Sequence, residues 1–267
     1  MLTKFNFYRT PKIEFGCGNI RKLPENIASF GKKTLIITGG KSFRSTPAFF
    51  CLIDELQNLK IKHYLHSASG EPSPGLVNSI TDKYRNKRIK VVVGIGGGSV
   101  MDTAKAVSAM LLKNDNVENY LEGVGNKYHD GRKIPFIAVP TTSGTGSEAT
   151  KNAVLSQVGE SGYKKSLRHD NFIPNLALID PELMISCPHS VSINCALDAF
   201  SQLIESFVSK EASPFTDSLV ISAVKKIKKS FFAVIKNLEN VEARSDMAYV
   251  ALISGITLAN AGLGTVH

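Results

Sequence analysis

Two glycine-rich segments of this chain have the residue types and spacing that bind anions. In the first, residues 91–107, a β-branched run typical of a buried parallel strand leads into the loop GIGGGS (94–99) and then into a helical pattern. Glycines let a backbone approach a ligand closely, and the first N–H groups of a helix point at an anion that lies before it. The order of strand, glycine loop and helix therefore predicts a site for a phosphate or pyrophosphate group.

The glycine loop matches neither of two common phosphate-binding patterns. Ser99 stands where a dinucleotide fingerprint has its third glycine, and the Gly-Lys-Ser at 40–42 lacks the upstream glycine of a P-loop. The alternative is a glycine-rich turn in which Ser99 caps the helix and Asp102, three residues later, completes a capping-box-like pair. From this loop alone, both interpretations stay open.

The second segment, residues 137–150 (IAVPTTSGTGSEAT), repeats the arrangement with hydroxyl groups. A short apolar strand ends in threonines, serines and two glycines, which offer donors and backbone access to a sugar or a phosphate. Such a tract is also typical of an ordinary loop, and Glu148 is also typical of a helix N-terminus. Because ligands of open α/β sheets bind outside the carboxyl ends of strands, the two loops together predict a shared nucleotide site.

A third group of polar residues lies on a predicted helix, residues 193–207. Asp198, Gln202 and Glu205 are three or four residues apart and fall on one stripe beside a broad apolar face. One interpretation is a solvated stripe. The other is that Asp198 and Gln202 point into a cleft between domains as oxygen ligands of a divalent ion, the carboxylate being a good ligand and the amide a weak one. His267 ends the chain, where a side chain is usually frayed.

The elements that would position these groups follow from hydrophobic periodicity. Up to Cys187-Pro188 apolar strands alternate with helical patterns, and from Ser190 onward the pattern is almost wholly helical. The expected fold class is α/β, with an N-terminal parallel-sheet nucleotide-binding domain (1–188) and a C-terminal all-helical domain (189–267) that is incomplete. The expected strands are 33–38, 61–65, 90–95, 134–139 and 176–179, and the expected helices are 50–59, 76–84, 100–113, 193–207, 213–238 and 244–261.

Length and composition exclude several classes of protein. The 267 residues, 43% hydrophobic and 21% charged, are ample for a folded core. No stretch reaches about 18 consecutive apolar residues and the N-terminus lacks a secretory signal, so no membrane span and no export are expected. The four cysteines show no C-x-x-C spacing, and we expect reduced thiols in a cytoplasmic protein.

The net charge of +9 raises the question of a nucleic-acid partner. The densest basic cluster lies opposite an apolar face of helical spacing and consists of Lys225, Lys226, Lys228 and Lys229. This arrangement indicates the solvated side of an amphipathic helix, and no interleaving of aromatic and basic residues accompanies it. We expect no nucleic-acid partner.

Five motifs, taken in order, resemble the iron-containing (group III) alcohol dehydrogenase family: GGGSVMDTAKA, PTTSGTGSEAT, LIDPEL, LDAFSQLIESFVS and AGLGTVH. The opening stretch FGCGNIRKLPENI is similar as well. The resemblance implies an α/β nucleotide-binding domain joined to a helical metal domain, and reversible hydride transfer between NAD(P)H and an alcohol–aldehyde or ketone pair. Members of the family continue past the equivalent of residue 267, so we expect a fragment of a longer polypeptide rather than a naturally shortened one.

The resemblance also implies which residues bind the cofactor. Those of the glycine loop would hold the pyrophosphate, Asp102 would contact the cofactor, and the threonines of the second loop would line the adenosine and ribose side. Lys164 or Lys165 would reach the ribose. The implied cofactor-binding residues are Gly39, Gly40, Gly96, Gly97, Gly98, Ser99, Asp102, Thr141, Thr142, Thr145, Thr150 and Lys164.

The choice between NAD and NADP depends on the end of the first predicted strand. Gly39 stands where NAD-preferring relatives often have an aspartate, which would accept from the ribose 2′-hydroxyl and repel a 2′-phosphate. The lack of that carboxylate, together with nearby Lys41, is compatible with NADP(H). The preference stays open at this point.

The implied metal site departs from the family pattern. Family members usually bind a divalent ion, often iron, through one aspartate and three histidines. Asp198 matches the first ligand and His267 the third, whereas Gln202 stands where the second is usually histidine, and the fourth would lie beyond residue 267. Iron or zinc is the expected metal, but the loss of an imidazole favours oxygen-preferring ions, and metal-free relatives of this fold exist.

The leading functional hypothesis is an NAD(P)-dependent, metal-assisted alcohol dehydrogenase or aldehyde reductase with a small-molecule substrate. The alternative is a catalytically impaired nucleotide-binding remnant with an incomplete metal site. Dehydroquinate-synthase-like lyases fit less well, because LDAFSQLIE and GLGTVH suit the alcohol dehydrogenases better. The sequence assigns no catalytic residue and names no particular alcohol, and a homodimer is left open.

Overall fold

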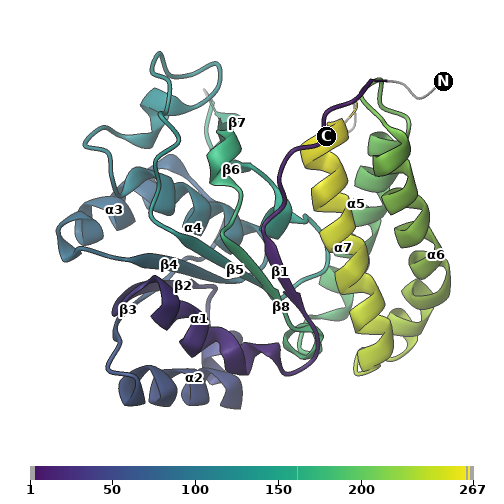
Figure 1. The fold of residues 1–267 in the computed structure, drawn as a ribbon, viewed down its shortest axis with the longest axis horizontal. Helices are drawn as coiled ribbons and strands as arrows, with labels where there is room; N and C mark the ends of the chain where they lie inside the picture. The colour runs from purple at the N-terminus through teal and green to yellow at the C-terminus, as the bar shows by residue number, and fades with distance from the viewer. Residues whose placement is uncertain (1–3, 161, 263, 265–267) are drawn as a thin grey trace.

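The computed structural model of the chain describes residues 4–160, 162–262 and 264. Its centre is a six-stranded sheet in the order β1-β8-β5-β4-β2-β3, in which every pairing is parallel (Figure 1). The strands are β1 (Lys12–Phe15), β2 (Lys33–Thr38), β3 (Lys62–Ser67), β4 (Val91–Gly96), β5 (Phe136–Pro140) and β8 (Leu176–Ile179). The parallel α/β sheet expected from the sequence is therefore confirmed, with β1 as a strand that the periodicity did not indicate.

The register of the central strands brings their carboxyl ends to one edge. Thr38 of β2 pairs with Ile95 of β4, and Gly96 of β4 pairs with Pro140 of β5. Because each of these residues ends or nearly ends its strand, the glycine loop and the hydroxyl-rich loop leave the sheet side by side. The loops were expected to meet at this edge, and they do.

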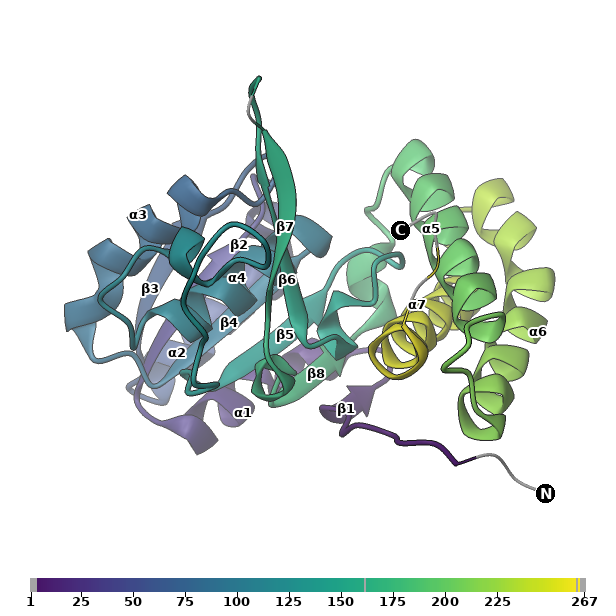
Figure 2. The same ribbon diagram turned by 90° about the horizontal axis from the view of Figure 1, so that it is seen from above.

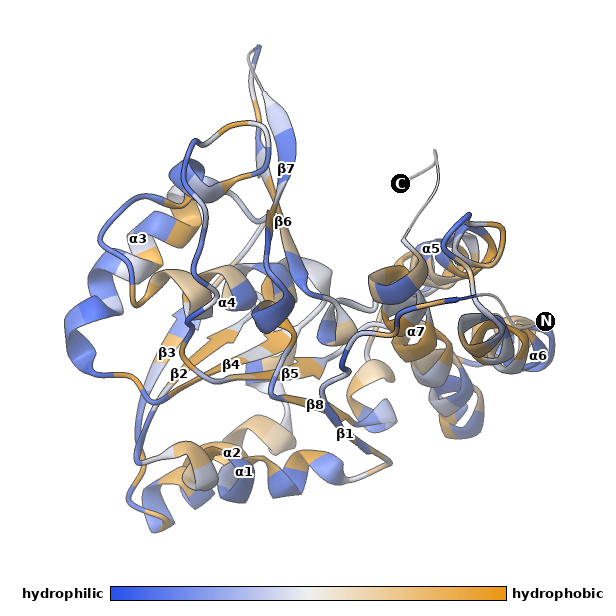
Figure 3. Ribbon diagram, turned by 45° about the horizontal axis from the view of Figure 1, so that its top comes forward, coloured by the Kyte–Doolittle hydropathy of each residue, from blue (hydrophilic) through white to orange (hydrophobic). Residues whose placement is uncertain are grey.

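Helices cover both faces of the sheet, as the burial of every residue in β4, β5 and β8 requires, because successive residues of a strand point to opposite faces. Leu35 and Ile37 belong to the core under α3 (Pro74–Tyr84) and α4 (Gly98–Met110), whereas Ile36 belongs to the core under α1 (Leu23–Phe30) and α2 (Pro47–Asn58). Figure 3 shows the strands as the most apolar layer of this region. Short 3-10 helices join these elements: η1 (Asn19–Lys22), η2 (Phe43–Ser45), η3 (Arg85–Lys87), η4 (Val117–Tyr120), η5 (Ser147–Ala149), η6 (Asp170–Phe172) and η7 (Pro181–Met184).

An antiparallel hairpin, β6 (Asn152–Gln157) and β7 (Tyr163–Arg168), rises from the sheet beside α4 (Figure 2). Ala153, Leu155 and Leu167 are buried in the core that α3 and α4 share. The sequence analysis did not predict this hairpin. It forms one wall of the site described below.

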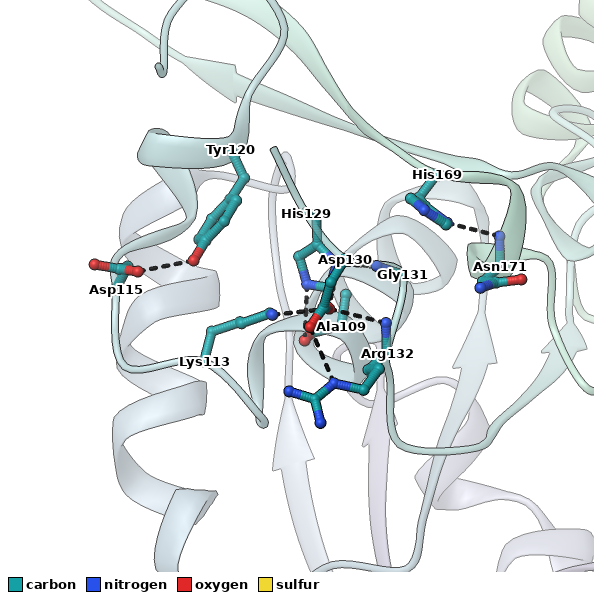
Figure 4. A network of polar contacts seen from close by, with 10 residues as sticks. All are labelled: Ala109, Lys113, Asp115, Tyr120, His129, Asp130, Gly131, Arg132, His169 and Asn171. Carbon is teal, nitrogen blue, oxygen red and sulfur yellow. Dashed lines mark hydrogen bonds and ion pairs between the residues drawn. The ribbon is translucent and has the colours of Figure 1, made fainter. Parts of the chain in front are cut away.

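The connection between α4 and β5 is held by a network of polar contacts (Figure 4). The Asp130 carboxylate lies 2.8 Å from the Lys113 amine and accepts from Arg132 Nε at 3.0 Å; these contacts hold its pKa well below the usual range. The His129 ring accepts from the Gly131 N–H at 2.9 Å and packs edge-on against Phe172. A long polar segment is thereby tied to the end of α4.

The rest of the chain is helical: α5 (His189–Phe207), α6 (Pro214–Lys236) and α7 (Val241–Ala261). Helix α7 lies between the sheet and the other two helices (Figure 1), and it is buried on nearly every side. This explains why its sequence is apolar around the whole helix rather than along one stripe. None of the described helices is both long and apolar enough to cross a membrane.

The basic cluster of α6 is exposed, as the sequence predicted. All four lysines of the cluster face solvent, and two of them form ion pairs with carboxylates of α7: Lys226 with Asp246 at 2.8 Å and Lys229 with Glu242 at 2.7 Å. The four cysteines are all unpaired.

The hydroxyl-rich loop meets α7 backbone to backbone. Gly146 has φ +61°, and a Cβ atom added at Gly255 would lie 2.1 Å from the Gly146 carbonyl oxygen. Ser254 Oγ lies 3.4 Å from the Gly144 carbonyl oxygen. Two glycines therefore allow the helical region to contact the loop that carries the candidate site.

Replacing Gly255 with alanine should lower the free energy of unfolding by about 1–3 kcal/mol, because the added methyl group overlaps the Gly146 carbonyl. Urea titration followed by circular dichroism measures the effect. Gly75→Ala is the matched control, since nothing lies within 4 Å of a Cβ at this position in α3, and this variant should be unchanged or slightly more stable. Equal stability of the two variants would show that the two backbones are not in contact.

Candidate functional site

A cleft of about 1090 Å³ lies between the α/β region and the helical region. Its lining comes from the start of α4, from the loop after β5, from the β6–β7 hairpin, and from α5 and α7. The lining residues on which the argument depends are Gly98, Ser99, Asp102, Thr145, Ser147, Thr150, Asn152, Val154, Lys164, Asp198 and Gln202.

Helix α4 points its N-terminus at this cleft. Gly97 is the N-cap residue, no side chain caps the helix, and Gly98 and Ser99 line the cleft. The first N–H groups of α4 and the helix dipole are therefore directed toward the cleft, which suits an anion. The capping-box interpretation is wrong, because Asp102 instead accepts from the Ser147 hydroxyl at 2.5 Å and from the Val154 N–H at 3.2 Å.

The glycines of the loop are required by close packing. A Cβ atom at Gly96 would lie 2.6 Å from Val100 Cγ2, and one at Gly98 would lie 2.7 Å from Thr145 Cγ2. Real side chains do not approach so closely, so larger residues here would push α4 away from the sheet or from the second loop. Contacts with Val100 and Thr145 therefore fix the conformation of the loop without a ligand.

The second loop lies against the first. The Thr141 N–H donates to the Gly96 carbonyl oxygen at 2.9 Å, and Thr142 lies 3.3 Å from the position of a Cβ at Gly97. Thr145 and Thr150 line the cleft, whereas Thr141 and Thr142 lie beside the glycine loop and outside the lining set. The structure thus brings the predicted threonines together with the glycines, although it places only two of the four on the cleft surface.

Gly39 and Gly40 follow β2 at the same edge of the sheet. A Cβ at Gly39 would lie 3.7 Å from Val100 of α4, and the Gly39 carbonyl oxygen accepts from the Ser67 hydroxyl at 2.9 Å. Arg44 comes back toward this point, where its Nε donates to the Thr38 hydroxyl at 2.7 Å. The end of β2 therefore carries two glycines and nearby cationic side chains, and no carboxylate follows it in residues 39–46.

The register of the hairpin separates the two candidate lysines. Lys164 lines the cleft together with Ser166 and Arg168, which are spaced two residues apart along β7. Lys165 lies on the other face, where its Nζ is 3.5 Å from the position of a Cβ at Gly123. Of the two predicted alternatives, Lys164 is the one placed at the site.

The polar stripe of α5 is not solvated. Gln202 is 4% exposed and Glu205 is 8% exposed, while the apolar Leu197 on the same helix is 52% exposed. Asp198 and Gln202 both line the cleft, as predicted, and Gln202 Oε1 accepts from the Ser254 hydroxyl at 3.0 Å. The third predicted ligand, His267, lies outside the described residues, and within residues 4–160, 162–262 and 264 no three His, Cys, Asp or Glu side chains gather to hold a metal.

The sequence analysis missed a buried charged cluster behind the cleft. Lys105 of α4 is 0% exposed and donates to the Ser147 carbonyl, the Thr150 hydroxyl and the Asn152 carbonyl, each at 2.8 Å. Burial lowers the pKa of Lys105 to about 8, and burial raises the pKa of neighbouring Glu148 to about 7. The sequence offered one signal, a lysine in a helical stretch of otherwise small and apolar residues. The partners of Lys105 could not be identified from it, because they lie 42 to 47 residues away in the sequence.

Comparison with known protein families gives two adjoining matches. Residues 10–181 match the profile described as iron-containing alcohol dehydrogenase, and residues 192–267 match the C-terminal part of the Fe-containing alcohol dehydrogenase family. Together these matches cover nearly the whole chain, including both loops and the residues of α5.

Individual relatives agree with the family matches. The chain is 30% identical over 263 residues to the NAD-dependent methanol dehydrogenase of Bacillus methanolicus (98% of this chain, 68% of the relative) and 31% identical over 270 residues to the choline dehydrogenase of Bacillus subtilis (100% and 66%). The solved structure of sulfoacetaldehyde reductase from Bifidobacterium kashiwanohense in complex with NAD+ superposes with a TM-score of 0.90 at 29% identity (98% and 68%). The chain spans about two thirds of the length of these relatives.

Glu148 should give the stability of the fold a distinct pH dependence. Its raised pKa means that the folded chain keeps a proton that the unfolded chain has already released between pH 4.5 and about 7, so stability falls as the pH rises through that window. Glu148→Gln should remove this dependence, which amounts to up to about 3 kcal/mol.

Urea titrations of both proteins at several pH values measure the difference. The exposed Glu55 provides the control, because Glu55→Gln should leave the pH profile of the wild-type protein unchanged. A constant difference in stability between wild type and Glu148→Gln across the whole range would contradict the assignment.

Proposed function

Because the chain belongs to the iron-containing alcohol dehydrogenase family, we propose that it is an oxidoreductase that transfers a hydride between NAD(P)H and a small alcohol–aldehyde pair. The observation that carries the proposal is that one cleft has a side suited to an anion and a side lined by polar side chains. On one side are the N-terminus of α4 and the hydroxyl-rich loop, and on the other are Asp198 and Gln202 of α5.

The residues of the chain have distinct tasks in this proposal. The N–H groups of Gly98 and Ser99 bind the pyrophosphate, because these residues begin α4 and the N-terminal end of a helix dipole attracts anions. Three side chains of the cleft hold a ribose of the cofactor: the carboxylate of Asp102, the hydroxyl of Thr145 and the amine of Lys164. When bound, the nicotinamide ring supplies or accepts the hydride. The substrate would be held on the side of the cleft that Asp198 and Gln202 of α5 line.

We propose NADP(H) as the preferred cofactor. A carboxylate after the first strand of such a fold accepts from the 2′-hydroxyl of NAD, whereas a nearby arginine accommodates the 2′-phosphate of NADP. Here Gly39 stands at that position, with Lys41 and Arg44 nearby. The NAD+ in the related reductase is a property of that protein.

Metal assistance stays a prediction of the resemblance. The described residues supply one carboxylate, Asp198, and an amide oxygen of Gln202 that already accepts from Ser254. This donor set does not fit the one aspartate and three histidines of the family, since a neutral amide is a weak ligand for iron or zinc. No step of the proposed reaction is therefore assigned to a metal.

A homodimer and a cytoplasmic location also stay predictions. The unpaired state of all four cysteines agrees with a reducing compartment. The predicted alternative is a nucleotide-binding remnant without turnover. It would bind the cofactor at the same site but would not oxidise NADPH when an aldehyde is added.

The cofactor assignment is tested by titrating wild type and Gly39→Asp with NADPH and NADH in a calorimeter, followed by NADPH oxidation with short-chain aldehydes. Wild type should bind NADPH more tightly. Gly39→Asp should weaken NADPH binding by about tenfold or more, through repulsion of the 2′-phosphate, and leave NADH binding equal or better. Gly75→Asp is the control, because Gly75 lies in the first turn of α3 with nothing within 4 Å of its Cβ position. Absence of binding for both cofactors would overturn the proposal, and binding without oxidation would favour the remnant.

The departure at the metal site is tested by Gln202→His. Restoring the imidazole should raise the affinity for Zn²⁺ or Fe²⁺ by about tenfold or more, because imidazole is a far better ligand than an amide. Anaerobic calorimetry and metal content after dialysis measure the change without relying on activity. Asp198→Ala in the same background should remove the gain. Tight binding of either metal by the wild-type protein, unaffected by Asp198→Ala, would contradict the assignment of these two residues.

A further inference from the structure

Lys105 lies directly behind the wall of the cleft. Its side chain is wholly buried, and its amine is surrounded by acceptors from Ser147, Thr150 and Asn152. All three of these residues line the cleft. A single buried cation therefore ties α4, which carries the glycine loop, to η5, the following loop and β6, which form the opposite part of the same wall.

Hydrogen bonds lead from this cation to the surface of the cleft. The Ser147 hydroxyl accepts from the Lys105 amine at 3.0 Å and donates to Asp102 Oδ1 at 2.5 Å. Asp102 Oδ2 accepts from the Val154 N–H at 3.2 Å. Both oxygens of a carboxylate that lines the cleft are thus held from the protein side. The serine hydroxyl accepts from Lys105 through a lone pair of its oxygen and gives its one proton to Asp102.

The charge of Lys105 also acts on Asp102. Burial raises the pKa of the Asp102 carboxyl, and the Lys105 ammonium is the strongest of the influences that lower it, ahead of the Ser147 hydroxyl and the Val154 N–H. A carboxylate can only accept hydrogen bonds, whereas a carboxylic acid also donates one. The protonation state of Asp102 therefore decides which ligand groups it can bind.

We propose that Lys105 is a positioning residue of the cofactor cleft, which acts through Ser147 to hold Asp102 in place and ionised, so that Asp102 accepts a hydrogen bond from a sugar hydroxyl of the cofactor. The inference rests on the proposed function, because it gives Asp102 a partner in the bound cofactor. It gives a role to a lysine at a wholly buried position, where a charge is costly unless it is paired and hydrogen-bonded.

Other charged groups face the same carboxyl. Glu148 adjoins Ser147 in η5, Lys164 of β7 lowers the pKa of Asp102, and Asp198 of α5 lines the opposite side of the cleft. A change at residue 105 leaves these groups in place. The ammonium of Lys105 also lowers the pKa of Glu148, so the comparison is made in a Glu148→Gln background, where the difference with and without Lys105→Met isolates the influence of the buried cation on Asp102.

The test is the pH dependence of NADPH affinity with and without Lys105→Met in that background, from about pH 5.5 to about pH 9.5. Methionine is similar in length and carries no charge. The pH below which affinity is lost should be higher in the variant by about one unit or more, so that affinity is about tenfold lower near pH 6 and recovers at high pH. A merely structural role of Lys105 predicts the same loss at every pH, and that result would overturn the proposal.

A measurement without cofactor separates this inference from the proposed function. Carbon-13 NMR of labelled aspartates, with Asp102→Asn to assign the signal, follows the titration of the Asp102 carboxyl in the free protein. Its midpoint should be higher with Lys105→Met than without it. If NADPH binds neither protein but the midpoint rises, the proposed function fails and the role of Lys105 stands. An unchanged midpoint overturns that role whatever the cofactor does.

Three further variants keep the test decisive. Ser147→Ala retains the cation but breaks the link to Asp102, so it should raise the midpoint in the same direction by a smaller amount. Lys105→Gln, which keeps a hydrogen-bond donor without the charge, replaces Lys105→Met if that variant does not fold. Lys133→Met is the matched control, because burial also lowers the pKa of Lys133 to about 8 while its amine donates to Asn175, just before β8. Lys105 also lowers the pKa of Lys133, but Lys133 is not among the groups that shift the pKa of Asp102. Lys133→Met should alter stability and leave the Asp102 midpoint unchanged.

Discussion

The candidate site depends on how closely the backbone of residues 94–98 approaches its surroundings. A side chain at Gly96 would overlap Val100, and one at Gly98 would overlap Thr145, so the loop can connect β4 to α4 only with glycine at these positions. This close connection lets α4 begin at the edge of the sheet with its first N–H groups free to face the cleft. The proposed anion site follows from that geometry, since a helix N-terminus combines unpaired donors with the positive end of the helix dipole.

The second wall of the cleft is tied to the first by equally close contacts. Gly146 and Gly255 let the hydroxyl-rich loop and α7 meet backbone to backbone, and Ser254 donates to Gln202 of α5. Behind the same loop, Lys105 connects α4 to the start of the hairpin. The groups proposed to hold the cofactor and those proposed to face the substrate are therefore fixed by one loop, which is the arrangement that hydride transfer over a short distance requires.

Much of this arrangement was predictable from local sequence. The β-branched run before GIGGGS and the apolar run before PTTSGTGSEAT indicated two parallel strands, and parallel strands place their following loops at one edge. Burial on α5 was not predictable, because Gln202 is covered by α7, whose position no local pattern reveals. The hairpin was not predicted, because the alternation of apolar and polar residues in β6 and β7 is short and directly follows a Ser/Thr/Gly tract typical of a loop. The role of Lys105 depends on partners more than 40 residues away, which one sequence cannot place beside it.

The central claim is that the start of α4 and the hydroxyl-rich loop grip a dinucleotide. Amide hydrogen exchange, followed by mass spectrometry with and without saturating NADPH, measures this directly. The account predicts slower exchange in peptides that cover residues 96–102 and 145–151, with little change in the Lys-rich face of α6. Protection that is absent from both loops, or confined to the helical region, would contradict it.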